Sequence, residues 1–288
     1  MINKKYLILA MMLGLNSACG TKNISQKTLI VTGLAPIASL ITVIAGDKYD
    51  IRFIIPNNTD PHNFNLKPSD AIILAKADTI IALDNHFDGK ILSTADNTVK
   101  FHLLNTESEN THEDHDHSNN PHLWISYKHL GDLSQKITEI LIANFPENKW
   151  DFQKNNKTFN DRLEKYYQQI KNLYKDSDKK IFVVQRHNVW DYLLKELDIE
   201  LIATLYEHEG EQVSVKKMVT IINKINEISN KDQIVMIDDA FTDPSTVLQA
   251  ISDQTGVKIK VLNPMGSQDN TTIDPIDLLD IYSKLLIN

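Results

Sequence analysis

Residues 28–83 read TLIVTGLAPIASLITVIAGDKYDIRFIIPNNTDPHNFNLKPSDAIILAKADTIIAL, and this stretch decides the fold. Three runs in it are rich in Ile, Val and Thr and predict buried strands, at 28–32, 51–55 and 79–83. Between them lie two segments with helical spacing, 36–45 and 68–77, and each opens on a proline, as a first helical turn can. Such alternation predicts βαβ units and a parallel sheet.

The same alternation returns in the second half of the chain. Strand-like runs lie at 181–184, 201–205, 233–237 and 257–262. Between the second and third of them we predict an amphipathic helix whose apolar face is formed by Val215, Met218, Val219, Ile222 and Ile225. A second helix is expected near Pro244, with Thr242 or Asp243 as its cap. The fold class is therefore α/β in both halves.

An apolar stripe at helical spacing separates the two halves. Its members are Phe159, Leu163, Tyr166, Ile170, Leu173 and Tyr174. The stripe predicts one long helix over roughly residues 154–176, without glycine or proline inside it. Between two lobes such a helix is a stiff connection, whereas a surface helix of a single domain would show the same stripe. The chain length favours two lobes, which we place at 28–153 and 179–288, with the linking helix at 154–178.

The first residues have the build of a secretory signal peptide. Two lysines precede an apolar stretch at 6–15 that is too short to span a membrane, and small residues follow it. The one cysteine of the chain, Cys19, lies at the cleavage point, where a bacterial lipoprotein carries its lipid, although Asn16 stands where an aliphatic residue is usual. We predict a signal peptide at 1–18, a tether at 19–27 and lipidation of Cys19. Plain secretion, with Cys19 removed or free, is the alternative.

Composition and charge narrow the range of functions. The formal net charge of −8 disfavours binding to nucleic acid and is compatible with binding to cations. No second apolar run approaches the roughly 18 residues of a membrane span, so a lipid anchor would be the contact with a membrane. A single cysteine cannot form a disulfide within the chain. The sequence also lacks the motifs of serine hydrolases, P-loop proteins and HExxH metalloproteases.

Three histidines lie in contexts that suit metal binding. His62 and His187 come just after predicted strands, at the sheet edge where open α/β folds place their ligand crevices. His62 and His122 each follow a proline, which restricts the loop backbone. Neutral imidazole is a good ligand for Zn²⁺, and aromatic neighbours would exclude water, namely Phe64, Trp124 and Trp190. From the spacing alone, ordinary surface or core histidines remain the alternative.

A polar segment at 106–120 directly precedes His122. It contains no apolar residue and must be a solvated loop. Its three histidines, His112, His115 and His117, are interspersed with acids and would suit zinc scavenging at low affinity. A dispensable solvated loop that binds metal only adventitiously is the alternative.

Several motifs resemble those of one transport family. Residues 45–78 contain Ala45-Gly46-Asp47, Ile54-Ile55-Pro56, Asp60-Pro61-His62, Lys67-Pro68-Ser69-Asp70 and Ala77-Asp78. Later motifs follow in the same order, namely Pro121-His122-Leu123-Trp124, Arg186-His187-Asn188 and Glu207-His208-Glu209-Gly210-Glu211. From about residue 28 to its C-terminus the chain resembles the zinc and manganese solute-binding proteins of ABC importers, also called the zinc-uptake A or TroA-like family.

The resemblance implies two α/β lobes joined by one long rigid helix, with metal in the cleft between them. It implies that His62 and His122 of the first lobe and His187 of the second bind the metal. The manganese branch typically has a carboxylate as its third ligand, so the resemblance favours Zn²⁺ over Mn²⁺. The softness of imidazole ligands points the same way.

The fourth ligand stays open at this point. Several members of the family use an aspartate near the C-terminus, where this chain has Asn263, which is neutral and a poorer ligand. The position is left to water, to a loop histidine, or to a carboxylate such as Asp238 or Asp239. Asp238 matches an acidic position of the family and is our candidate.

The expected function is that of an extracytoplasmic, lipid-anchored receptor, a monomer that captures zinc and delivers it to the membrane permease of an ABC importer. A manganese receptor of the same family and a metal-binding surface adhesin are the alternatives. A zinc hydrolase also uses three protein ligands and an open position, but no hydrolase motif supports it and we expect no enzymatic activity. Histidine ligands predict that affinity weakens as the pH falls through about 6.5.

Overall fold

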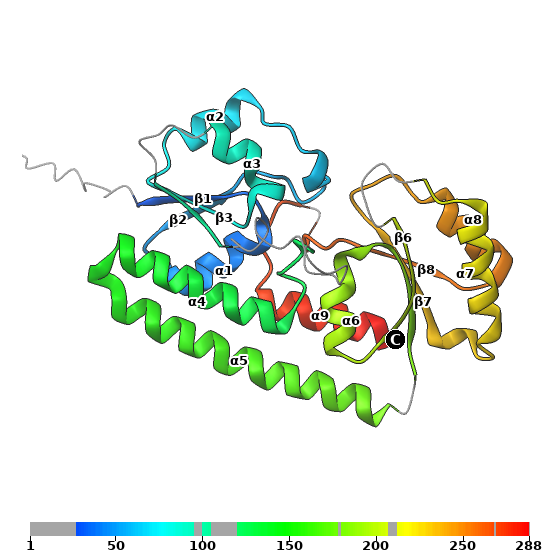
Figure 1. Ribbon diagram of the computed structural model, residues 1–288. Coiled ribbons are helices and arrows are strands. Elements are labelled where there is room, and N and C mark those ends of the chain that lie inside the picture. Colours follow the sequence, from blue (N-terminus) through cyan, green and yellow to red (C-terminus); the bar gives the residue numbers. More distant parts are fainter. Residues whose placement is uncertain are drawn as a thin grey trace, which may run out of the picture.

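The computed structural model describes residues 27–94, 100–104, 120–177, 180–206, 212–267 and 269–287. In these residues the chain forms two lobes, each built on a four-stranded parallel sheet (Figure 1). The first sheet has the order β2-β1-β3-β4, with β1 at Leu29–Thr32, β2 at Asp50–Phe53, β3 at Thr79–Ala82 and β4 at Lys100–Leu103. The second has the order β6-β5-β7-β8, with β5 at Phe182–His187, β6 at Glu200–Tyr206, β7 at Ile234–Asp239 and β8 at Ile259–Leu262.

The two sheets therefore share one topology. In each sheet the first strand has its successor on one side and the following strand on the other, so the strand order reverses between β1 and β3 and again between β5 and β7. Loops at the carboxyl ends of strands around such a reversal are the usual place for a ligand. The strands predicted from Ile- and Val-rich runs are confirmed. β4 was missed because its four residues include no β-branched side chain.

Helices cover both sheets. The predicted helices α1 (Ala35–Ala45), α2 (Pro68–Leu74) and α7 (Val215–Glu227) are present. The helix expected near Pro244 is α8 (Thr246–Thr255), but the predicted cap is wrong. Its N-cap is Ser245, whose hydroxyl accepts a hydrogen bond from the Leu248 backbone N–H at 3.2 Å. Further helices are α3 (Asn85–Thr94), α4 (Tyr127–Asn144), α6 (Asp191–Glu196) and α9 (Pro275–Ile287).

The long helix is α5, and it runs along both lobes (Figure 1). It spans Lys149–Asp176, so it begins earlier than the residue 154 expected from the apolar stripe. The first turn was missed because Trp150 is 80% exposed and Phe152 alone faces the core there. Without a glycine or proline inside it, the helix is the stiff connection that the sequence predicts.

The chain after β8 returns to the first lobe. α9 packs against α5 and α1, and the Ser39 hydroxyl donates a hydrogen bond to the backbone oxygen of Ile273 at 2.7 Å. One hydrophobic core includes Ile30 and Leu34 of the first lobe, Val183 of the second, and Leu286 near the C-terminus. Helix α9 also contacts the second lobe, where the ring of Tyr282 packs on Trp190, so it lies against both lobes.

No helix in the described part of the chain is long and apolar enough to cross a membrane. The predicted signal peptide, Cys19 and the histidines of the loop at 106–120 lie outside the described residues.

Candidate metal site

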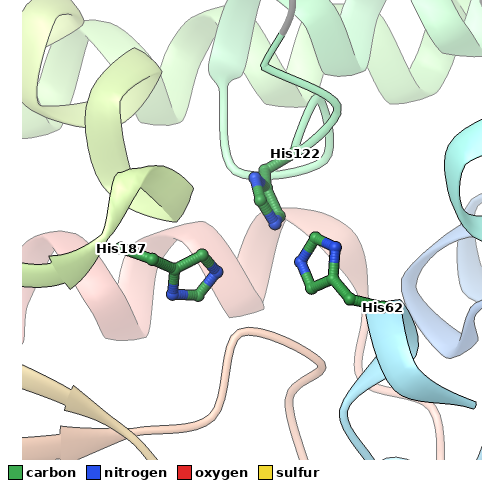
Figure 2. A group of neighbouring side chains, drawn as sticks. All are labelled: His62, His122 and His187. Carbon is green, nitrogen blue, oxygen red and sulfur yellow. The ribbon is translucent and has the colours of Figure 1, made fainter. Parts of the chain in front are cut away.

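The loop after β2 presents His62. Pro61–Asn63 form a single 3-10 turn, and the Asp60 side chain caps it by accepting a hydrogen bond from the His62 backbone N–H at 3.0 Å. The proline suits the first position of this turn because it lacks an N–H. The ring of His62 then points toward the second lobe (Figure 2).

A buried asparagine orients His122. The oxygen Oδ1 of Asn120 accepts hydrogen bonds from the His122 backbone N–H at 3.0 Å and from its ring Nδ1 at 2.7 Å. The amide nitrogen of Asn120 donates to the backbone oxygen of Asn188 at 2.6 Å, next to His187 in the second lobe. His122 itself is 2% exposed. The backbone and the ring of His122 are thus both tied to one side chain that also reaches the other lobe.

His187 is the last residue of β5, and a carboxylate on the neighbouring strand orients it. Asp239, the last residue of β7, lies with its Oδ2 at 2.7 Å from the ring Nδ1 of His187. Both residues therefore lie at the strand reversal of the second sheet. A carboxylate behind a histidine fixes the tautomer that leaves Nε2 free and makes that nitrogen a better ligand.

The structure brings His62, His122 and His187 together between the two lobes (Figure 2). One potential ligand nitrogen from each lies within 4.8 Å of the others. Each ring has a hydrogen-bonding partner at Nδ1, which favours Nε2 as the atom that each ring would offer to a metal. The Nε2 of His187 is buried and has no hydrogen-bond partner among the described residues. A buried polar atom without a partner is costly, and a metal ion would satisfy it.

Aromatic rings surround the three histidines. Phe87 lies with its ring centroid 4.9 Å from that of His62 and 5.5 Å from that of His122. Trp124 lies 5.4 Å from His122, and Phe241 lies 6.5 Å from His187. Such apolar walls limit water at a metal site. Of the aromatic residues proposed from the sequence, Trp190 packs on Tyr282 instead.

Burial keeps two of the three rings neutral. It is the main cause that lowers the pKa of His62 from 6.5 to about 4, an effect that Asp60 opposes and His187 reinforces. Burial also lowers the pKa of His122 well below its usual value. The neutral ring is the form that binds metal. Proton competition at His62 therefore sets in near pH 4 rather than near the value of about 6.5 expected from the sequence.

In the absence of metal, the parent protein should lose more stability than a His62→Gln variant as the pH falls. Folded His62 stays neutral down to about pH 4, whereas the unfolded chain binds the proton below about pH 6.5. The contribution of His62 to folding is therefore complete above pH 6.5 and is lost toward pH 4, a loss of about 3 kcal/mol. Urea unfolding of both proteins in EDTA at pH 7.5 and pH 4.5 measures it.

The two proteins have to be compared at each pH because another buried group acts in the opposite direction. Burial raises the pKa of the Asp88 carboxyl to about 7. Its contribution is therefore complete below its unfolded value and is lost as the pH rises toward 7. The comparison cancels this effect, since both proteins contain Asp88. If the two unfolding free energies differ by the same amount at both pH values, the lowered pKa of His62 is wrong.

Asp238, the candidate fourth ligand, is not brought together with the three histidines. Its Oδ1 accepts hydrogen bonds from the Arg186 guanidinium at 2.8 Å and from the Asp239 backbone N–H at 2.9 Å. Its Oδ2 accepts one from the Ser245 backbone N–H at 2.8 Å. Both oxygens of Asp238 therefore hold the start of α8 and Arg186 of β5 at the end of β7, which is a structural role. The neighbouring Asp239 serves His187 instead.

The side chain of Asn263 forms a hydrogen bond between the two lobes. Its amide nitrogen donates to the backbone oxygen of Asn57 at 3.0 Å, and its oxygen accepts from the Met265 backbone N–H at 3.0 Å. Asn57 also bonds to Asn270 and Thr271 through its backbone N–H and its side chain. The residue at the family's aspartate position is thus occupied in holding the first lobe to the loop after β8.

Sequence reasoning missed two residues that contact the ring nitrogens of the candidate ligands. Asn120 stands two positions before His122, and its asparagine-proline-histidine context was the available signal. His86 had no supporting context in the sequence, yet its Nε2 lies 2.8 Å from the Nδ1 of His62. Two other histidines lie elsewhere, His102 against Asn144 and His129 near Asp132. His208 lies outside the described residues.

Comparison with known proteins places the chain among metal-uptake proteins. The family described as zinc-uptake complex component A, periplasmic, matches residues 30–286. The high-affinity zinc uptake system protein ZnuA of Bacillus subtilis is 23% identical over 86% of this chain and 84% of its own length. The zinc-binding lipoprotein AdcA of Streptococcus pneumoniae is 25% identical over 87% of this chain, which spans 52% of AdcA.

Solved structures share the fold. A crystal structure of a ZnuA deletion mutant with zinc bound superposes with a TM-score of 0.75, at 20% sequence identity, over 91% of this chain and 98% of that one. The likeness confirms two parallel-sheet α/β lobes and the long helix.

Proposed function

Because this chain belongs to the family of zinc-uptake complex component A, periplasmic, we propose that His62, His122 and His187 are the ligands with which it captures zinc. The family makes the chain an extracytoplasmic solute-binding receptor of an ABC-type metal importer and not an enzyme. Zinc is its cargo, which the permease of the importer takes over. We propose that the receptor acts as a monomer.

One observation carries the assignment of the ligands. Three imidazoles from two lobes converge, and each has a hydrogen-bonding partner at Nδ1, which is His86, Asn120 or Asp239. The Nε2 of His187 is left buried without a partner among the described residues. Three such nitrogens around an open fourth position suit tetrahedral Zn²⁺ at about 2.0–2.1 Å. We propose water or a histidine of the loop at 106–120 as the fourth ligand.

The donor set favours zinc over manganese. Mn²⁺ prefers carboxylate, carbonyl and water oxygens, whereas imidazole suits zinc. The Asp239 carboxylate is engaged with the ring Nδ1 of His187. A manganese receptor would have to draw Asp239 away from that contact.

Release of zinc should require only small movements of the lobes. Hydrogen bonds cross between them at several points, including Asn120 to Asn188, Trp124 to Pro264 and Asn263 to Asn57. The Glu196 carboxylate also accepts from the Ser126 hydroxyl and two backbone N–H groups of α4. We propose that docking on the permease shifts the ligand loops rather than opening a hinge.

Metal content tests the proposal directly. The protein would be purified without a metal-affinity tag and analysed for zinc and manganese, together with His62→Ala, His187→Ala and the control His102→Ala. We expect about one zinc per parent chain and per His102→Ala chain, and loss of zinc from the other two. Full zinc content in both ligand variants would reject the site, and manganese in place of zinc would reject the metal.

Lipidation of Cys19 is a further proposal, supported by the lipoprotein AdcA among the relatives. Cys19 lies outside the described residues. We expect Cys19→Ala to move the protein from the membrane fraction to the soluble extracytoplasmic fraction, because a diacyl anchor supplies the two apolar chains that stable attachment needs. Detergent phase partition with immunoblotting measures this shift. A parent protein that already partitions into the aqueous phase would contradict lipidation.

A further inference from the structure

We propose that His86 is a positioning residue for metal capture, which holds the ring of His62 so that its Nε2 faces the metal. The proposal rests on the function proposed above, because it needs His62 to be a ligand. It assigns a role at the proposed metal site to a fourth histidine, which does not itself bind the metal.

The geometry of the two rings carries the proposal. The Nε2 of His86 lies 2.8 Å from the Nδ1 of His62, and the ring planes meet edge to face at 76°. A histidine that binds metal through Nε2 carries its proton on Nδ1 and needs an acceptor there. His86 offers that acceptor when its own proton is on Nδ1. The pair thus selects the one tautomer of His62 that is able to bind metal.

The local structure holds His86 in place. It lies in the first turn of α3, where the Asp84 side chain accepts a hydrogen bond from the Phe87 backbone N–H at 3.0 Å. The buried carboxyl of Asp88 accepts one from the Leu83 backbone N–H at 2.6 Å. These bonds join the start of α3 to the end of β3. The exposed ring of His86 is therefore carried by a rigid backbone.

The same helix is bonded to the loop of His62. The Lys90 ammonium donates to the backbone oxygen of Phe64 at 2.7 Å and to the side-chain oxygen of Asn65 at 3.0 Å. Phe87, next to His86, packs its ring against His62. Helix α3 is thus joined to the loop of His62 by the hydrogen bonds of Lys90 and by the packing of Phe87. These contacts hold the rings of His62 and His86 next to each other.

The other two ligands show the same arrangement with different partners. Asn120 accepts from the Nδ1 of His122, and Asp239 faces the Nδ1 of His187, and both partners are buried. His62 is the exception, since its partner is an exposed imidazole. A positioning role for His86 completes a pattern in which every ligand ring has one dedicated acceptor.

Zinc affinity of two variants separates this role from a general effect on folding. His86→Ala removes the acceptor and should weaken zinc binding about 10- to 100-fold, as loss of such partners does at other sites. His86→Gln keeps an acceptor oxygen at similar reach and should recover most of the affinity. His102→Ala, a histidine on β4, is the control and should bind zinc like the parent. Competition titration with a chelator measures all four proteins.

The tautomer of His62 gives a readout that does not depend on metal. Long-range ¹H–¹⁵N correlation spectra of the metal-free protein at pH 7.5 distinguish a proton on Nδ1 from one on Nε2. We expect His62 to be protonated on Nδ1 in the parent and in His86→Gln, and to exchange between both tautomers in His86→Ala. A change confined to overall stability would leave this signature unaltered.

The outcomes distinguish this proposal from the one it rests on. Unchanged zinc affinity in His86→Ala, or an unchanged tautomer of His62, overturns the positioning role. Equal losses in His86→Ala and His86→Gln with an unaltered tautomer also overturn it, because His86 would then bind metal itself. Retention of zinc by His62→Ala would instead reject the proposed metal site, whatever the His86 variants show.

Discussion

Replacing His122 with alanine is expected to weaken zinc binding by about a hundredfold. Four-ligand zinc sites bind with about 10–16 kcal/mol in total, so one ligand contributes about 3 kcal/mol, and every 1.4 kcal/mol corresponds to about tenfold in affinity. His122 is 2% exposed, and its ring is fixed at two points by Asn120. Water that replaces the ring would have to enter a buried space walled by Phe87 and Trp124.

Zinc competition with a chelator at pH 7.5 measures the dissociation constants of His122→Ala and the parent. The matched control is His102→Ala, which removes a histidine bonded to Asn144 and not to the three ligands. Both variants should first be shown to unfold cooperatively, so that lost binding is not lost folding. An affinity within a factor of a few of the parent would exclude His122 as a ligand.

Replacing Asp238 with alanine is expected to destabilise the protein by about 3 kcal/mol while changing zinc affinity by less than about tenfold. The substitution removes the carboxylate at 2.8 Å from the Arg186 guanidinium, whose side chain is 19% exposed, and leaves it only the Asp239 carboxylate at 4.0 Å among the ion pairs of the described residues. It also removes the acceptor of the Ser245 backbone N–H at the start of α8. Breaking a buried ion pair by removing one partner is costly because the other charge stays buried.

Urea unfolding of the metal-free protein measures the loss of stability, and a zinc titration of the folded variant measures affinity. Asp243→Ala is the control, since that exposed residue contributes its backbone oxygen and not its side chain to Arg186. Surface substitutions of this kind stay within about 0.5 kcal/mol. If Asp238→Ala keeps its stability but loses zinc about a hundredfold, Asp238 is a ligand after all and its role here is wrong.

The fold could be predicted wherever local pattern and tertiary environment agree. The parallel strands β1, β3 and β7 are buried at every residue and consist largely of apolar residues, because both faces of such a sheet are covered. Where the pattern is short or mixed, prediction failed, as for β4 and the first turn of α5. The return of α9 to the first lobe depends on contacts with residues far away in the chain, which no local pattern records.

The three histidines could be proposed as ligands because each stands in a short motif after a strand or a proline. The residues that hydrogen-bond to these histidines could not be predicted. Asp239 was considered, but as a metal ligand and not as a hydrogen-bonding partner of His187. His86 approaches His62 only because α3 begins beside the loop after β2, and Asp239 approaches His187 only because β7 pairs with β5. Asp238 was chosen because it matches an acidic position of the family, and that match does not reveal the three donors that occupy its carboxylate.

The sequence by itself determined the α/β class, the long connecting helix and the identity of the imidazoles offered to a metal, because strand and helix periodicity and short motifs are local properties. Only the tertiary structure shows which nitrogen of each ring has a hydrogen-bonding partner and which residue supplies that partner. The orientation of each ring depends on hydrogen bonds between residues up to 52 positions apart, as between His187 and Asp239. Their energy depends on distance and burial in the folded chain, which sequence spacing does not contain.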